Sequence, residues 1–243
     1  MRQYGLIGFP LTHSFSQKYF AEKFLNEGIN DAAFINFSIP QISDVELIFK
    51  AHPQLKGLAV TIPYKRAVIN YLDEVDDPVN EIPACNCIKI QSNKKTGFNT
   101  DIIGFEKSFT KHLTPQHIKA LVLGTGGAAA AIKFVLDKLN IEYLQVSRSA
   151  SAKTITYDEI SPVVMLEYTI IINCTPVGTH PHSNEAPLLP YSLLTSSHYL
   201  FDLVYNPSLT KFLQYGNEKN CIIENGYEML VLQAEENWKI WNS

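Results

Sequence analysis

The sequence predicts an α/β protein built from two α/β domains. Short apolar runs rich in β-branched residues alternate with segments of helical period along almost all of the 243 residues. Such alternation with short connections is typical of mostly parallel sheets covered by helices. A glycine loop begins at Gly124, after a first half that already holds several strands and helices. We therefore expect an N-terminal domain with a mostly parallel mixed sheet and a C-terminal domain of the Rossmann type.

The expected elements follow in order from these periodicities. Strands are expected at residues 3–8, 33–38, 56–61, 86–91, 119–123, 142–147, 169–173, 198–203 and 220–223. Helices are expected between them, at residues 16–27, 42–51, 64–72, 102–111, 127–139, 158–167, 208–216 and 226–241.

Composition narrows the class of protein. Hydrophobic residues make up 46% of the chain, charged residues 18%, and the net charge is −4, so no basic surface for a nucleic acid is expected. No apolar run approaches the roughly 20 residues that cross a bilayer, and the N-terminus lacks the pattern of a signal peptide. Cys85, Cys87, Cys174 and Cys221 form no C-x-x-C pair. We expect a cytoplasmic protein with free thiols, no metal and no membrane partner.

The glycine loop carries the first functional prediction. Gly124-Thr125-Gly126-Gly127-Ala128 follows the strand expected at 119–123 and enters a helix. Glycines let the backbone approach a pyrophosphate, which then meets the N-terminal amides of that helix. Glycine also clusters at plain helix–strand contacts, but the position between strand and helix favours a dinucleotide site.

The end of the next strand favours NADP over NAD. About 20 residues after the glycines, where NAD enzymes commonly place an acidic residue, the chain reads Ser147-Arg148-Ser149. A guanidinium can bind a 2′-phosphate, and Lys153 could add charge. The alternative is that Arg148 is an ordinary solvated loop residue.

Polar clusters follow the strands of the first half, where α/β sheets place ligand groups. They are Ser14 and Ser16 after the first strand, Thr61 and Lys65 after the third, Asn86, and Asp101. Each of these polar residues also has a purely structural interpretation. A serine or Asp101 could cap a helix, and Pro63 could set a turn.

Taken together, these motifs resemble the shikimate dehydrogenase family over nearly the whole chain. The family carries H-S-x-S, T-x-P-x-K, Ala-x-Asn, N-T-D-x-x-G, the glycine loop, N-R-T, N-x-T-P-x-G, D-x-x-Y-x-P and G-x-x-M-L-x-x-Q. The last three read here Asn173–Gly178, Asp202–Pro207 and Gly226–Gln233. The chain departs from the family at Gln17, Phe20, Ala21, Ser147 and Ser149, which leaves small changes in substrate and adenosine-phosphate contacts open.

The resemblance implies NADPH-dependent, reversible reduction of 3-dehydroshikimate to shikimate, a step of aromatic amino-acid (chorismate) biosynthesis. It implies Lys65 and Asp101 as the catalytic pair. The substrate-binding residues that it implies are Ser14, Ser16, Thr61, Asn86, Asp101, Tyr205 and Gln233. Around the cofactor it adds Thr175, Leu203, Gly226, Met229 and Asp77. Asp77 also reads as part of a solvated acidic turn.

The domain boundaries follow from the Rossmann unit, which begins with the strand before its glycine loop. We expect a substrate-binding and catalytic domain at 1–100, with the helix 226–243 packing back on it, and a dinucleotide-binding domain at 101–225. Because hydride transfer needs the reacting carbons about 3–3.5 Å apart, we expect the active site in the cleft between the domains.

Two alternative functions stay open. A quinate/shikimate dehydrogenase with relaxed substrate or NAD use differs by one or two pocket contacts. A non-catalytic ligand-sensing homologue would bind NADP or shikimate without turnover, although the presence of Lys65 and Asp101 favours an enzyme. Either a monomer or a homodimer is compatible with the sequence.

Overall fold

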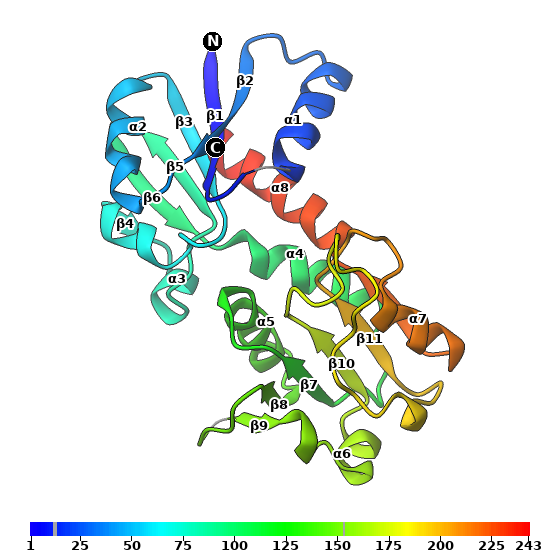
Figure 1. Ribbon diagram of the computed structural model, residues 1–243. Helices are drawn as coiled ribbons and strands as arrows, with labels where there is room; N and C mark the ends of the chain where they lie inside the picture. Colours follow the sequence, from blue (N-terminus) through cyan, green and yellow to red (C-terminus); the bar gives the residue numbers. More distant parts are fainter. Residues whose placement is uncertain (12–13, 153) are drawn as a thin grey trace. The chain divides into compact units, whose positions relative to one another are not determined.

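The computed structural model describes residues 1–11, 14–152 and 154–243 (Figure 1). The chain forms two compact units. Unit 1 comprises Met1–Asp101 and Gln233–Ser243, and unit 2 comprises Ile102–Leu232. The sequence placed the two boundaries at 100/101 and 225/226, so the return to unit 1 comes seven residues later than expected. Both crossings lie inside helices, α4 (Thr100–Phe109) and α8 (Tyr227–Asn242).

Unit 1 contains a six-stranded mixed sheet in the order β2-β1-β3-β5-β6-β4. Its strands are β1 (Arg2–Gly8), β2 (Ala32–Ser38), β3 (Leu55–Val60), β4 (Glu74–Val75), β5 (Cys87–Gln91) and β6 (Lys94–Phe98). Its helices are α1 (Phe15–Asn26), α2 (Val45–Ala51), α3 (Asp77–Glu81) and the C-terminal part of α8. β1 pairs in parallel with β2 and β3, whereas β5 is antiparallel to β3 and β6. The mixed sheet expected from the sequence is therefore present.

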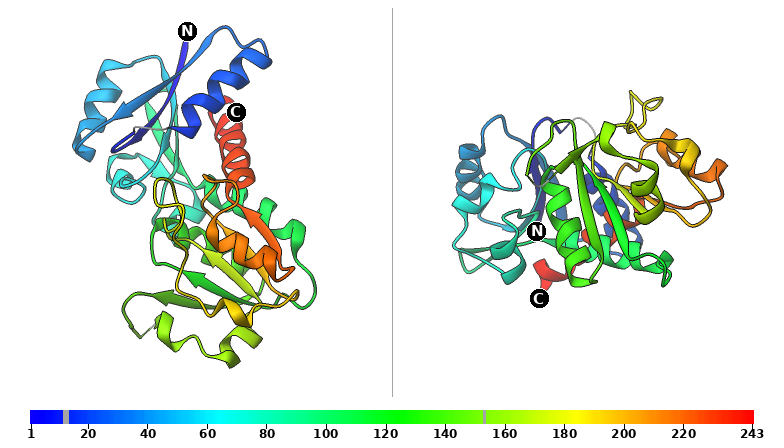
Figure 2. Two further views of the ribbon diagram at one scale, coloured as in Figure 1. Left: turned by 45° about the vertical axis from the view of Figure 1, so that its right-hand side comes forward. Right: turned by 90° about the horizontal axis from the view of Figure 1, so that it is seen from below.

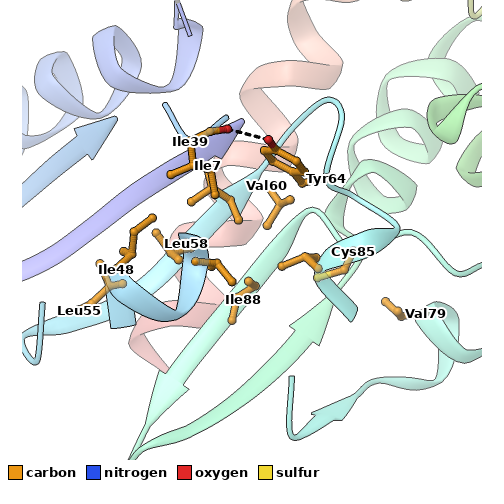
Figure 3. Packing of buried hydrophobic residues seen from close by; sticks show 12 residues of the cluster. Ile7, Ile39, Ile48, Leu55, Leu58, Val60, Tyr64, Val79, Cys85 and Ile88 are labelled. Atoms are coloured by element: carbon orange, nitrogen blue, oxygen red, sulfur yellow. Dashed lines mark hydrogen bonds between the residues drawn. The ribbon is translucent and has the colours of Figure 1, made fainter. Parts of the chain in front are cut away.

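Strand alternation sends the apolar residues of β1 to two cores. Ile7 packs with Val45 and Ile48 of α2 and with Leu58 in one cluster (Figure 3). Tyr4 and Leu6 face the other way, toward α1 and α8. Successive residues of a buried strand thus cover both faces of the sheet, which explains why β1 is apolar without a polar side.

Helix α8 belongs to the second of these cores through its two tryptophans. The Trp241 ring stacks on Tyr4, with centroids 5.2 Å apart, and its indole N–H donates to the Ile88 carbonyl at 3.0 Å. Trp238 packs edge-on against Tyr4 at 5.0 Å. Any Cβ at Gly57 would collide with the Trp241 ring, so glycine there lets the helix approach β3.

Unit 2 contains a six-stranded sheet in the order β12-β11-β10-β7-β8-β9. The strands are β7 (Lys119–Leu123), β8 (Glu142–Ser147), β9 (Thr154–Thr156), β10 (Ile170–Asn173), β11 (Tyr199–Asp202) and β12 (Ile222–Asn225). The connecting helices are α5 (Gly127–Lys138), α6 (Pro162–Glu167) and α7 (Lys211–Glu218). All neighbouring pairs are parallel. This is the doubly wound Rossmann order, and its switch point lies between β7 and β10. Figure 2 gives two further views of the ribbon.

Both faces of this sheet are covered. Phe105 and Phe109 of α4 pack on Phe201 and Tyr199 of β11. The other face carries a cluster of Leu121, Leu123, Ile171 and Leu200 with residues of α6 and α7, namely Met165, Phe212 and Leu213. Burial on both faces accounts for the near-continuous apolar strands that the sequence shows.

Some local expectations were wrong. The helix expected at 64–72 is only a short 3₁₀ segment, Ala67–Tyr71, because the preceding residues form a turn in which the Tyr64 amide donates to the Thr61 carbonyl. Strands β4, β6 and β9 were missed. Lys94–Phe98 is too polar to read as a strand, yet it pairs with β5 through a turn whose Ser92 and Asn93 both have positive φ. Among the described residues, no helix has the length and apolar character of a membrane span.

Candidate active site

Lys65 and Asp101 form an ion pair in unit 1. Lys65 lies in the turn after β3, where its carbonyl accepts the Cys85 amide at 2.7 Å. Asp101 occupies the first turn of α4, where the helix dipole favours a carboxylate. The Lys65 ammonium lies 2.5 Å from Asp101 Oδ2, with the two side chains 20% and 10% exposed. The geometry holds a positively charged proton donor in place at a partly desolvated site.

Asn86 forms a hydrogen bond with the other oxygen of the Asp101 carboxylate. Its Nδ2 donates to Asp101 Oδ1 at 2.9 Å, and its Oδ1 accepts the Thr100 amide at 2.7 Å. A carboxylate only accepts and a backbone N–H only donates, so the orientation of this buried amide is fixed from both sides. Asp101 is thereby held by two donors, one to each oxygen.

The loops after β1 and β3 bring the polar residues of the first half to one sheet edge, because parallel neighbours end together. Thr61 donates its amide to the Ile7 carbonyl at 2.9 Å, and a Cβ at Gly8 would touch the Thr61 side chain. Ser14 caps α1, its hydroxyl oxygen accepting the Gln17 amide at 3.1 Å. Ser16 is half-buried in the first turn of that helix.

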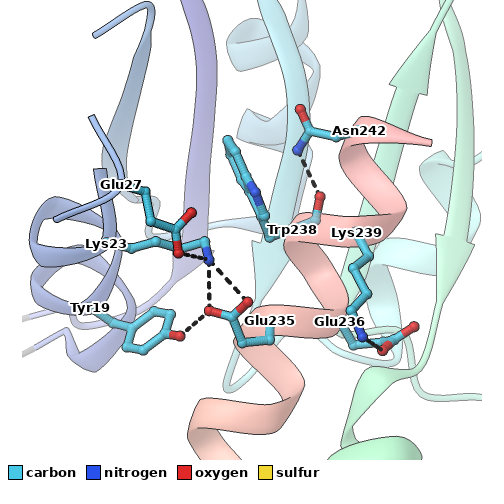
Figure 4. Close-up of polar contacts among 8 residues, drawn as sticks. All are labelled: Tyr19, Lys23, Glu27, Glu235, Glu236, Trp238, Lys239 and Asn242. Atoms are coloured by element: carbon cyan, nitrogen blue, oxygen red, sulfur yellow. Dashed lines mark hydrogen bonds and ion pairs between the residues drawn. The ribbon is translucent and has the colours of Figure 1, made fainter. Parts of the chain in front are cut away.

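A polar cluster holds the serine-bearing helix α1 to α8, which carries Gln233. Lys23 of α1 lies 2.7 Å from Glu27 and 2.9 Å from Glu235, and the Tyr19 hydroxyl also donates to Glu235 (Figure 4). The Lys23 side chain is almost completely buried, which strengthens its contacts relative to those of a surface pair. The cluster fixes Ser14 and Ser16 relative to Gln233 within unit 1.

In unit 2 the glycine loop lies at the switch point of the sheet. Gly124 has φ +103° and donates its amide to the Val146 carbonyl at 2.9 Å, while Gln145 Nε2 donates to the Gly124 carbonyl at 2.8 Å. A Cβ at Gly126 or Gly127 would meet nothing within 4 Å. The open backbone at the start of α5 therefore leaves room for a phosphate group beside the helix amides.

The end of β8 presents positive charge beside this loop. Arg148 is exposed, forms no ion pair with any residue in the described part of the chain, and lies near enough to Tyr157 to influence its hydroxyl electrostatically. The Ser149 amide donates to the Ser147 hydroxyl at 3.3 Å, which shapes the turn. Lys153, also expected at this site, lies outside the described residues.

The ends of β10 and β11 are joined by a buried polar network. The Asn173 Oδ1 accepts both the amide and the hydroxyl of Thr175, at 3.0 and 2.6 Å. The Asn173 Nδ2 donates to Asp202 Oδ1 at 2.9 Å, and the Leu203 amide donates to the Asn173 carbonyl at 3.0 Å. Thr175 and Leu203, both expected at the cofactor, are thus positioned by one side chain.

Two further expected cofactor residues lie at the start of α8. Gly226 has no room for a side chain, because a Cβ would collide with the Leu203 carbonyl. Met229 is buried one turn later. Tyr205 is half-buried in the segment after β11, where burial raises the pKa of its hydroxyl.

Comparison with known proteins identifies relatives named shikimate dehydrogenase. The profile of the shikimate dehydrogenase substrate binding domain matches residues 6–88. A curated shikimate dehydrogenase (NADP(+)) of Ignicoccus hospitalis is 34% identical, covering 98% of this chain and 92% of the relative. A crystal structure of a shikimate dehydrogenase from Peptoclostridium difficile matches with a TM-score of 0.86 and 33% identity, covering 100% of this chain and 92% of that chain.

The chain belongs to the shikimate dehydrogenase family. A further relative of known structure, from Thermus thermophilus, was crystallised with NADP(H) and shikimate. It has a TM-score of 0.87 at 26% identity, over 99% of this chain and 93% of that chain.

The structure brings together some of the residues expected from the family motifs. Lys65, Asn86 and Asp101 share hydrogen bonds, and the Gly124 backbone adjoins Thr175, whose Cγ2 lies 3.0 Å from where a Cβ would stand. Asp77 is exposed at the start of α3.

Four buried polar residues at the sites were missed: Thr100, Asn173, Asp202 and Asn237. The first three lie inside motifs quoted from the sequence, where only their neighbours were selected. Asn237 lies four residues after Gln233, so the helical period places both on one face of α8. This four-residue spacing from Gln233 could have identified Asn237 from the sequence.

Proposed function

We propose that this chain catalyses the NADPH-dependent, reversible reduction of 3-dehydroshikimate to shikimate. The observation that carries the proposal is the Lys65–Asp101 pair, joined at 2.5 Å, at the positions of the family's T-x-P-x-K and N-T-D motifs. Membership of the family supplies the substrate class, and the pair supplies a group able to do the acid–base chemistry.

Lys65 is the proton donor in the direction of reduction. Negative charge develops on the ketone oxygen, and the ammonium both stabilises that charge and transfers its proton to the oxygen. In the direction of oxidation the neutral amine accepts the hydroxyl proton. Asp101 holds Lys65 in position and offers its carboxylate to a neighbouring hydroxyl of the substrate.

The cofactor, when bound, supplies the hydride. The residues of unit 2 fit such a group. The exposed backbone of Gly126 and Gly127 suits the pyrophosphate, and the exposed guanidinium of Arg148 suits a 2′-phosphate. Thr175 and Leu203 lie in the loops that would adjoin the nicotinamide.

The substrate groups find partners in unit 1. Ser14 and Ser16 at the N-terminus of α1 would bind the carboxylate, aided by the helix amides. Asn86 has one amide hydrogen on Asp101 and a second with no acceptor among residues 1–11, 14–152 and 154–243, which would suit a ring hydroxyl. Thr61 and Gln233 would also bind ring hydroxyls.

A steady-state assay tests the proposal. The purified chain should reduce NADP in the presence of shikimate and oxidise NADPH in the presence of 3-dehydroshikimate, with much lower rates for NAD and for quinate. Comparable rates with quinate or NAD would favour the relaxed dehydrogenase, and binding of shikimate without turnover would favour the ligand sensor. The cytoplasmic location, the monomeric or dimeric state and an active site between the domains stay predictions.

A further inference from the structure

Asn237 is a buried amide on α8 that lies outside the family motifs quoted above, the last of which ends at Gln233. The residue is only 1% exposed. It lies in a helix that also buries Ala234 and Trp241 in the core of unit 1. Burying an amide is costly unless its hydrogen bonds are made. The partners of Asn237 therefore indicate why a polar residue stands there.

Those partners are residues of the candidate active site. The Thr100 hydroxyl donates to Asn237 Oδ1 at 2.7 Å, and Asn237 Nδ2 donates to Gln233 Oε1 at 3.3 Å. Thr100 also contacts Asn86, through its amide at 2.7 Å and through its hydroxyl at 3.2 Å. One continuous chain of hydrogen bonds thus runs from Gln233 through Asn237, Thr100 and Asn86.

Each bond in this chain has one direction in the structure. The carboxylate of Asp101 and the backbone amide of Thr100 fix Asn86, as described above. The Thr100 hydroxyl has a single proton and two candidate acceptors, and the contact with Asn237 Oδ1 is shorter by 0.5 Å, 2.7 against 3.2 Å. Asn237 then turns its NH₂ group toward Gln233, so Gln233 must turn its carbonyl oxygen toward Asn237.

We propose that Asn237 is a positioning residue for the substrate site, and that it sets which end of the Gln233 amide faces the substrate. With the Gln233 carbonyl oxygen accepting from Asn237, the substrate would meet the NH₂ end of Gln233, which would donate to a ring hydroxyl oxygen. Through Thr100 the same chain ties Gln233 to Asn86 and Asp101. This inference rests on the proposed function, because it names Gln233 as a ligand of shikimate.

The substitution Asn237→Asp tests it with an isosteric side chain. The carboxylate still accepts from Thr100 but cannot donate to Gln233 Oε1, so the Gln233 amide is expected to turn over. We expect shikimate to bind roughly three- to tenfold more weakly by titration calorimetry, the loss typical of one hydrogen bond, with NADP binding unchanged. The control Lys239→Gln makes the same change in charge on α8 at an exposed side chain that contacts Glu236 (Figure 4), and should leave both affinities unchanged.

A second pair of variants avoids a buried charge. Thr100→Val keeps the shape but removes the hydroxyl, whereas Thr100→Ser keeps the hydroxyl. Shikimate affinity should fall for the valine variant and stay near the parent value for the serine variant. Equal weakening of shikimate and NADP, or shikimate affinity within twofold of the parent in both Asn237→Asp and Thr100→Val, would overturn the inference. A parent chain that does not bind shikimate would instead overturn the proposed function, and with it the role given to Asn237.

Discussion

Asn173 and Asp202 lie opposite each other at the ends of the parallel strands β10 and β11, and their fully buried side chains share a hydrogen bond of 2.9 Å. Asp202 also accepts the Thr210 hydroxyl at 2.6 Å and the Val204 amide at 3.0 Å. One buried carboxyl therefore fixes the two loops that carry Thr175 and Leu203. Burial nevertheless raises the pKa of Asp202 to about 6.

This raised pKa predicts the pH dependence of stability. A carboxyl with pKa near 3.9 in the unfolded chain and about 6 in the folded chain makes the native state bind more protons between those values. Its contribution to the free energy of unfolding is therefore largest below about pH 4 and falls as pH rises through 6, by about 2–3 kcal/mol in total. Asp202→Asn should remove this component, because the amide does not ionise.

The measurement is urea denaturation of parent and Asp202→Asn between pH 4.5 and 7.5. As pH rises, the free energy of unfolding of Asp202→Asn should increase relative to that of the parent. Asp158→Asn, the same change at an exposed position of unit 2, is the control and should run parallel to the parent. If Asp202→Asn also runs parallel, the carboxyl does not titrate in this range.

Lys65→Ala should lower kcat far more than it raises KM, because the ammonium acts mainly where charge develops in the transition state. The expected loss in kcat is about 10²–10⁴-fold, typical of removing a general acid–base group. The exposed Lys56 of the same unit gives a matched control, Lys56→Ala, which should keep full activity. A kcat within a few-fold of the parent would reduce Lys65 to a binding residue.

Arg148→Ala should discriminate between the two nicotinamide cofactors. Only NADPH carries the 2′-phosphate, and a charge-assisted hydrogen bond is worth roughly 1.5–3 kcal/mol, or about 10- to 150-fold in affinity. NADPH should therefore bind more weakly by that factor in fluorescence titration, while NADH binds as before. Lys219→Ala, at an exposed lysine of unit 2, should alter neither. Equal losses for NADPH and NADH would assign Arg148 to folding and reopen use of NAD.

Two glycine substitutions should separate a packing role from a cofactor role. Gly226→Ala forces a Cβ into the Leu203 carbonyl, a rigid backbone group, so Tm should fall clearly. Gly126→Ala places its Cβ in open space, so Tm should be unchanged while NADP binds at least about tenfold more weakly, ~1.4 kcal/mol, because the phosphate can no longer approach the backbone. Unchanged NADP affinity in Gly126→Ala would mean that the loop does not bind the pyrophosphate.

Local signals in the sequence were enough for the main elements of the fold. The glycine loop between an apolar strand and a helix predicted the Rossmann unit, because phosphate binding requires that order of elements. The spacing of apolar residues along the chain predicted most strands and helices, with bounds within a few residues of those observed. It failed at 64–72, where a turn replaces the helix, and at Lys94–Phe98, whose strand depends on pairing with β5 rather than on its own composition.

The sequence by itself determined which chemical groups this protein carries: an ammonium, carboxylates, serines, and a glycine loop with an arginine after it. Only the tertiary structure decided which of them meet. Thr100 and Asn237 are 137 residues apart, yet they share a hydrogen bond of 2.7 Å because α8 returns to the core of unit 1. Asn173 faces Asp202 because two parallel strands pair in one register. Contacts of this kind depend on strand order, register and helix packing, which no local pattern of residues encodes.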